Sequence, residues 1–144
     1  MSKPDCALSL FRQGFSCSQA VAAAFADDLG LDKDTALRVS QPFGGGIARR
    51  ADWCGAMTGA FLVLGLKHGR TRAEDAASRD KTYALVREFI DRFTARHTHF
   101  RCKDLLGCDI GTPEGQRTAD ERGLHKTRCE DFVRDAAVIL EEIL

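Results

Sequence analysis

The amino-acid sequence predicts an all-α fold, a compact bundle of about five to seven helices around a central helix rich in glycine and alanine. Apolar residues recur at helical rather than alternating spacing along nearly the whole chain. The chain has only three prolines, and β-branched residues, which favour strands, seldom follow one another. Its 144 residues suit one domain, residues 1–144, that can bury a core without disulfides.

Three short helices are predicted in the first part of the chain, at about residues 5–13, at about 18–28, and from 32 or 34 to about 40. Gly14 ends the first, because glycine readily adopts the left-handed conformation found at helix ends. The second starts at a capping box, in which Ser16 caps the helix and Gln19 lies three residues later. Pro42 follows the third and stops it.

A loop with three consecutive glycines comes next, Gly44, Gly45 and Gly46. Such residues let the backbone approach another group closely or adopt positive φ angles, and a flexible connection is the equally weighted alternative. They match no phosphate-binding fingerprint, because no lysine followed by serine or threonine comes after them. A nucleotide site is therefore not predicted.

The central helix begins after this loop, with Asp52 as its N-cap and Cys54 in its first turn. Gly55 and Gly59 give it a face of small residues on which another helix can pack closely. Its nearly apolar run, residues 56–66, is too short for the roughly 17 to 20 residues that span a bilayer. We therefore interpret it as a core helix.

Two further capping boxes, at Thr71 with Glu74 and at Thr127 with Glu130, predict a long helix that reaches about residue 96 and a last helix near the C-terminus. Between them, Thr112 is predicted to cap a shorter helix. The apolar stripe of the long helix is typical of a core rather than of a ligand site. It consists of Tyr83, Val86, Phe89, Ile90 and Phe93.

Composition excludes some classes of function. Lysine plus arginine and aspartate plus glutamate both number 21, so no basic surface for nucleic acid is indicated. The N-terminal residues, MSKPDCALSL, lack the basic and apolar regions of a secretory signal, which predicts a cytoplasmic protein. In that compartment the six cysteines indicate metal binding, redox chemistry or simple burial rather than permanent disulfides.

Cys17, Cys54 and Cys129 each fall in the first turn of a predicted helix, and Cys102 opens a shorter predicted one. Free N–H groups and the helix dipole favour a thiolate there, so we expect pKa values lowered from about 8.5 towards neutrality. No C-x-x-C pair occurs, so tertiary folding must assemble any metal site or redox disulfide. The four histidines fall in predicted loops or helix ends and are expected to be exposed: His68, His97, His99 and His125.

Several segments resemble the C_GCAxxG_C_C family of redox-active proteins: GFSCSQAV, FGGG, CGAMTG, CKDLLGCD and CEDFV. Together they cover nearly the whole chain. The resemblance implies a small helical protein with a shared thiol site. The family's cysteines correspond to Cys17, Cys54, Cys102 and Cys129, whereas Cys6 and Cys108 lie outside the pattern.

Three functions remain open from the sequence. In the leading hypothesis, two or more of the four family thiols cycle between dithiol and disulfide or pass electrons to a redox partner, and any enzyme activity is that of a thiol-disulfide oxidoreductase. In the second, the same cysteines bind zinc, copper or an iron–sulfur cluster. In the third, the cysteines only pack, and the glycine-rich face of the central helix binds a partner or a second copy in a homodimer. Candidate cofactor-contacting positions are Gly44, Gly45, Gly46, Gly55 and Gly59.

Overall fold

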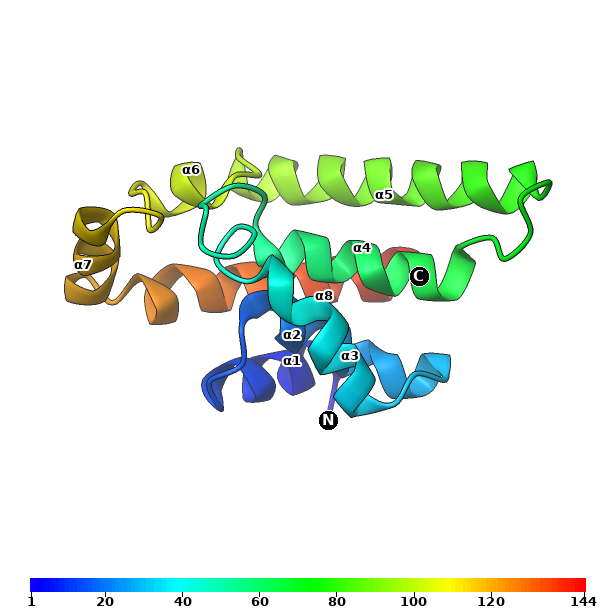
Figure 1. Ribbon diagram of the computed structural model, residues 1–144, viewed down its shortest axis with the longest axis horizontal. Coiled ribbons are helices and arrows are strands. Elements are labelled where there is room, and N and C mark those ends of the chain that lie inside the picture. The colour runs from blue at the N-terminus through cyan, green and yellow to red at the C-terminus, as the bar shows by residue number, and fades with distance from the viewer.

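The computed structural model describes all residues from 1 to 144, and they form an all-helical structure (Figure 1). Its eight α-helices are α1 (Lys3–Arg12), α2 (Cys17–Ala26), α3 (Lys33–Ser40), α4 (Gly55–His68), α5 (Ala76–His97), α6 (Cys102–Leu106), α7 (Pro113–Glu121) and α8 (Glu130–Ile143). The predicted fold class is confirmed, with one helix more than the expected range. None of the helices is long and apolar enough to cross a bilayer.

The helices are arranged in layers. In Figure 1, α5 runs along one side of the molecule, α4 and α8 lie beneath it, and α1, α2 and α3 cover the opposite side. Helix α4 packs against α2, α5 and α8, which confirms it as the central helix. The short helices α6 and α7 lie together at one end.

The hydrophobic core fills the space between these layers. Met57 and Leu64 of α4 and Phe89 and Phe93 of α5 are fully buried. Tyr83, predicted to join them, is 57% exposed, so that prediction is wrong. At 100° per residue, Tyr83 points about 100° away from the direction midway between Phe89 and Phe93.

Most early helix boundaries follow the predicted caps. The hydroxyl of Ser16 accepts from the N–H of Gln19, and the side chain of Gln19 accepts from the N–H of Ser16 at 3.0 Å. This capping box starts α2 at Cys17. Thr112 caps α7 as predicted, by accepting from the N–H of Gly115 at 3.0 Å.

Helix α5 starts later than predicted. Its N-cap is Asp75, whose carboxylate accepts from the N–H of Ser78 at 3.0 Å. The predicted capping box of Thr71 and Glu74 is wrong, because Glu74 instead pairs with the guanidinium of Arg72 at 2.8 Å.

The predicted capping box of Thr127 and Glu130 is also wrong. The backbone is already helical before this point, and both the N–H and the hydroxyl of Thr127 donate to the carbonyl of Gly123, at 3.1 and 3.2 Å. A π-helical turn, His125–Cys129, runs directly into α8. Cys129 therefore lies inside a continuous helical segment rather than at a helix start.

Candidate functional site

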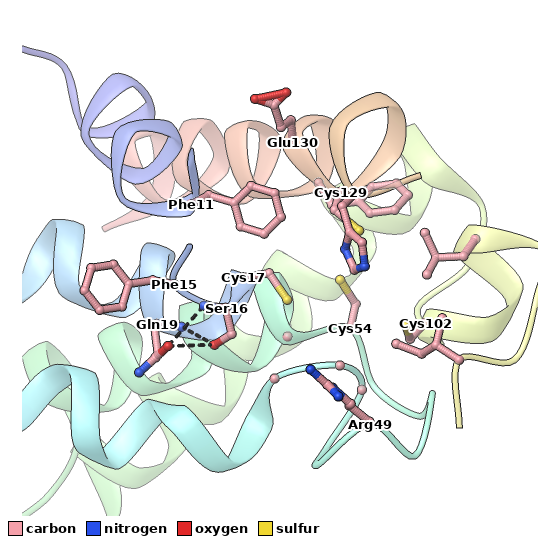
Figure 2. Close-up of a pocket in the computed structure, with 18 of the residues that line it drawn as sticks. Phe11, Phe15, Ser16, Cys17, Gln19, Arg49, Cys54, Cys102, Cys129 and Glu130 are labelled. Atoms are coloured by element: carbon pink, nitrogen blue, oxygen red, sulfur yellow. Dashed lines mark hydrogen bonds between the residues drawn. The ribbon is translucent and has the colours of Figure 1, made fainter. Parts of the chain in front are cut away.

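One pocket of about 1210 Å³ is lined by all four cysteines that the sequence predicts as site residues: Cys17, Cys54, Cys102 and Cys129. They come from α2, the residue before α4, α6 and the π-helical turn, which are far apart in the chain. Figure 2 shows the sulfur atoms of Cys17, Cys54 and Cys129 turned towards the same space. Cys6 and Cys108 do not line the pocket.

Cys17 is the first residue of α2, and its side chain is half-buried. Burial raises the pKa of the Cys17 thiol, and backbone N–H groups of Gly45, Ser18 and Ala56 that face the sulfur partly offset this effect. These donors come from the glycine loop and from the starts of α2 and α4. The sulfur of Cys17 therefore lies where three segments meet.

Cys54 is itself the N-cap of α4, two residues later than the predicted cap at Asp52, and is 5% exposed. Its N–H donates to the carbonyl of Phe100 at 2.9 Å, and the N–H of Cys102 donates to the carbonyl of Asp52 at 2.6 Å. An isolated antiparallel bridge at Trp53 joins the same two segments, and the Trp53 ring lies 4.2 Å from that of Phe100. This pairing fixes the backbone of Cys54 beside that of Cys102.

The thiols of Cys17 and Cys54 influence each other at the start of α4. Burial raises the pKa of Cys54 well above its ordinary value, and the nearby Cys17 raises it further. The backbone N–H of Ala56 opposes the rise in the pKa of both thiols. Both thiols are therefore placed at the start of α4, and Figure 2 shows their sulfur atoms turned towards the same space.

Two glycines of α4 make this proximity sterically feasible. A Cβ atom on Gly55 would lie 2.5 Å from the sulfur of Cys17, and one on Gly59 would lie 2.6 Å from the carbonyl oxygen of Ser18. The glycine face is therefore covered by α2, as expected for a surface on which another helix packs closely, and it is not exposed for the partner that the third hypothesis placed there. Gly55 lines the pocket, whereas Gly59 lies behind it in the contact between the helices.

Cys102 and Cys129 complete the pocket wall. Cys102 opens α6 as predicted, and burial, followed by the nearby Cys17, raises its pKa to about 12. Burial also raises the pKa of Cys129, with Cys17 and Cys102 contributing in the same direction. The guanidinium of Arg128 donates to the carbonyl of Leu105 at 2.7 Å and so ties the π-helical turn to α6.

The glycine loop forms another side of the pocket, and all three of its glycines line it. Gly44 approaches Ser16 so closely that a Cβ atom would lie 2.8 Å from the serine Cβ, and Gly45 and Gly46 have φ angles of 66° and 72°. Close approach and positive φ, both expected from the sequence, therefore occur together. The left-handed conformation continues through residues that rarely adopt it: Ile47, Ala48, Arg49 and Ala51.

No three histidine, cysteine, aspartate or glutamate side chains are arranged to hold a metal ion, and all six cysteines are free. Of the histidines, His125 is exposed and lines the pocket, and His99 is exposed as predicted. The prediction of exposure is wrong for His68 and His97, which are partly buried. His97 lies 2.7 Å from a carboxylate oxygen of Asp135.

The predicted lowering of the thiol pKa values is wrong for all four cysteines. Helix starts and backbone N–H groups are present at Cys17 and Cys54, but removal of the thiols from water has the larger effect. Helix position is a local property of the sequence, whereas burial depends on the assembled fold. The thiols are therefore mostly protonated at neutral pH.

Raised thiol pKa values predict a loss of stability at alkaline pH. The ordinary pKa of 9.0 applies to Cys102 in the unfolded chain, compared with about 12 in the fold. The contribution of this thiol to the free energy of unfolding is complete below about pH 9. It falls as the pH rises towards 12, because in that range the Cys102 thiol has lost its proton in the unfolded chain but keeps it in the fold. The expected slope is about 1.4 kcal/mol per pH unit for each such thiol.

Urea unfolding of the reduced protein at increasing pH measures this slope. The variant Cys102→Ala is expected to have a slope smaller by the amount that corresponds to one proton. Equal slopes for both proteins would contradict this assignment.

A family model described as "Putative redox-active protein (C_GCAxxG_C_C)" matches residues 15–143, a range that includes all four pocket cysteines. No curated protein and no solved structure matches the chain.

Proposed function

The chain belongs to the C_GCAxxG_C_C family, and on this premise we propose that it is a thiol-based redox protein in which Cys17 and Cys54 form the reactive pair. The observation that carries the proposal is the position of the Cys17 sulfur beside the backbone that follows Cys54: a Cβ atom on Gly55 would lie 2.5 Å from it, and Figure 2 shows both sulfurs turned towards the same space. In each cycle the dithiol loses two electrons and two protons and becomes a disulfide. A reductant restores it.

The two cysteines differ in ways that suit different roles. Cys17 is half-buried, and its pKa is raised, whereas that of the buried Cys54 is raised well above its ordinary value, so the Cys17 thiolate forms more readily and is more accessible to an oxidant. We assign it the first attack. Cys54 is 5% exposed. In the second step its thiolate attacks the sulfur of Cys17 and completes the disulfide. Because the thiolate is the attacking form, the raised pKa values predict an exchange rate that increases with pH above neutrality.

A metal site is the second candidate, and the specific observation in its favour is that four thiols line one pocket. Thiolates are soft ligands that suit zinc, copper(I) and iron–sulfur clusters. The side chains do not fit such a group as they stand, because no three donors converge. A metal would therefore require the thiols to turn towards a common centre, whereas the dithiol needs only two of them.

Anaerobic purification followed by a free-thiol count and elemental analysis tests the proposal. We expect six free thiols without bound metal, reversible loss of two thiols on mild oxidation, and a disulfide-linked peptide pair that contains Cys17 and Cys54. Loss of four would indicate a second disulfide, which the same peptide mapping would assign. Thiols that stay masked until a chelator is added, together with stoichiometric metal, would overturn the dithiol proposal in favour of the metal site.

A further inference from the structure

The charges around the thiol pocket are unbalanced. Five ionisable side chains besides the cysteines line it: Arg12, Arg49, His125, Lys126 and Glu130. Arg12 forms an ion pair with Glu130, which leaves Arg49 and Lys126 without an acidic partner. Both are exposed, so they can meet a molecule that enters from solvent. An anion gains from two unpaired positive charges there, and a cation is repelled.

The rest of the wall suits a small organic molecule rather than a free inorganic ion. Phe11, Phe15 and Phe132 line the pocket, as do Leu105 and Ile110. Its volume of about 1210 Å³ is somewhat larger than the roughly 300–1,000 Å³ of ordinary ligand pockets, which are concave and largely apolar with a few polar groups. Cys54 is recessed at 5% exposure, so an oxidant has to enter the pocket for the second step to take place beside it.

We propose that the oxidant is a low-molecular-weight disulfide whose two halves carry carboxylates. This inference rests on the proposed dithiol function and names its substrate class. Apolar parts of the molecule contact the aromatic wall, and its carboxylates face Arg49 and Lys126. The same charges disfavour a disulfide whose halves carry amines.

The reaction is balanced without any further oxidant. The thiolate of Cys17 attacks one sulfur of the substrate, a mixed disulfide forms, and the first half leaves as a thiolate. The thiolate of Cys54 then attacks the sulfur of Cys17 and releases the second half. Two electrons pass from the protein dithiol to the substrate disulfide, and the two thiol protons end on the released halves.

A charge series of disulfides tests the substrate class. The anaerobically reduced protein reacts at low salt with dithiodipropionate, bis(hydroxyethyl) disulfide or cystamine, which are anionic, neutral and cationic. Mass spectrometry follows protein oxidation, and each rate is divided by the rate of the same disulfide with dithiothreitol, which removes intrinsic differences in reactivity. We expect the normalised rate for the anionic compound to exceed that for the cationic one roughly tenfold, with the preference decreasing as salt is added.

Variants identify the residues responsible. The double variant Arg49→Gln with Lys126→Gln is expected to lose the preference, whereas Arg87→Gln, which removes an exposed charge of α5 outside the pocket, is expected to retain it. Oxidation without charge preference, or an equal preference in the double variant and the control, overturns the substrate class and leaves the dithiol function standing. Failure of all three disulfides to oxidise the protein overturns the substrate class, and it overturns the dithiol function as well if mild oxidation also leaves all six thiols free.

Discussion

Replacement of Gly59 with alanine is expected to destabilise the protein by about 1–3 kcal/mol, the usual cost of forcing extra volume into a packed contact. The added Cβ would lie 2.6 Å from the carbonyl oxygen of Ser18 and 3.1 Å from its Cα. These are backbone atoms at the start of α2, so no side-chain rotation can relieve the overlap. Helix α2 has to move away from α4, and Cys17 moves with it.

The matched control lies in the same helix. Gly65→Ala places its Cβ in open space, so the expected result is a stabilisation of about 0.5–1 kcal/mol from the higher helix propensity of alanine. Urea unfolding of both variants in the reduced state gives the two free energies. Equal stabilities, or a destabilised Gly59→Ala variant whose Cys17 and Cys54 still pair at the wild-type rate, would contradict the role assigned to this contact.

The parts of the site that were predictable from sequence depend on residues close together in the chain. Ser16 and Gln19 are three residues apart and specify the start of α2 through reciprocal hydrogen bonds. This alone places Cys17 at a helix start. The small residues Gly55 and Gly59 likewise indicated close packing, although the sequence did not identify α2 as the neighbour.

Two other capping-box patterns predicted helix starts that the structure does not have, because another residue provides the cap or the backbone is already helical. Thr71 and Glu74 match a capping box as well as the pair at Ser16 does, but Asp75 lies nearer to the apolar stripe of α5 and provides its cap. Thr127 follows backbone that is already helical, so no free N–H group needs its hydroxyl. A capping pattern therefore predicts a helix start only when the preceding residues are not helical.

The thiol pKa values and the set of residues that line the pocket depend on how the helices pack, and the sequence does not show this. The helix-start rule predicted low thiol pKa values, but the sequence gives no measure of how far α2, α4 and α6 together exclude water from the pocket. Arg12 and Lys126 line the same pocket from opposite ends of the chain, and no spacing within the sequence relates them. Long-range contacts of this kind appear only once the helices are packed.

Alanine variants of the two reactive cysteines are expected to separate the two steps of the proposed cycle. In Cys54→Ala, Cys17 can still attack a disulfide, but nothing resolves the product, so a mixed disulfide accumulates on Cys17. Release of the second half then depends on a thiol from solution and slows by at least about a hundredfold, because the intramolecular reaction loses its high effective concentration. In Cys17→Ala the first attack itself is lost, and no mixed disulfide is expected.

Intact-mass measurements after a short exposure to oxidant, followed by peptide mapping, distinguish these outcomes. The control is Cys6→Ala, a change of a partly buried cysteine of α1 outside the pocket, which is expected to retain the full cycle. Circular dichroism verifies that each variant is folded. Full cycling in Cys54→Ala would contradict the assigned pair, because another thiol would then resolve the mixed disulfide. The close approach of the Cys17 sulfur to Gly55 would in that case reflect only how α2 packs on α4. A mixed disulfide that accumulates on Cys17 in Cys54→Ala, while the Cys6→Ala control cycles normally, supports the assigned pair. Such accumulation requires an attacking thiol at Cys17 and the absence of the thiol that normally resolves the product.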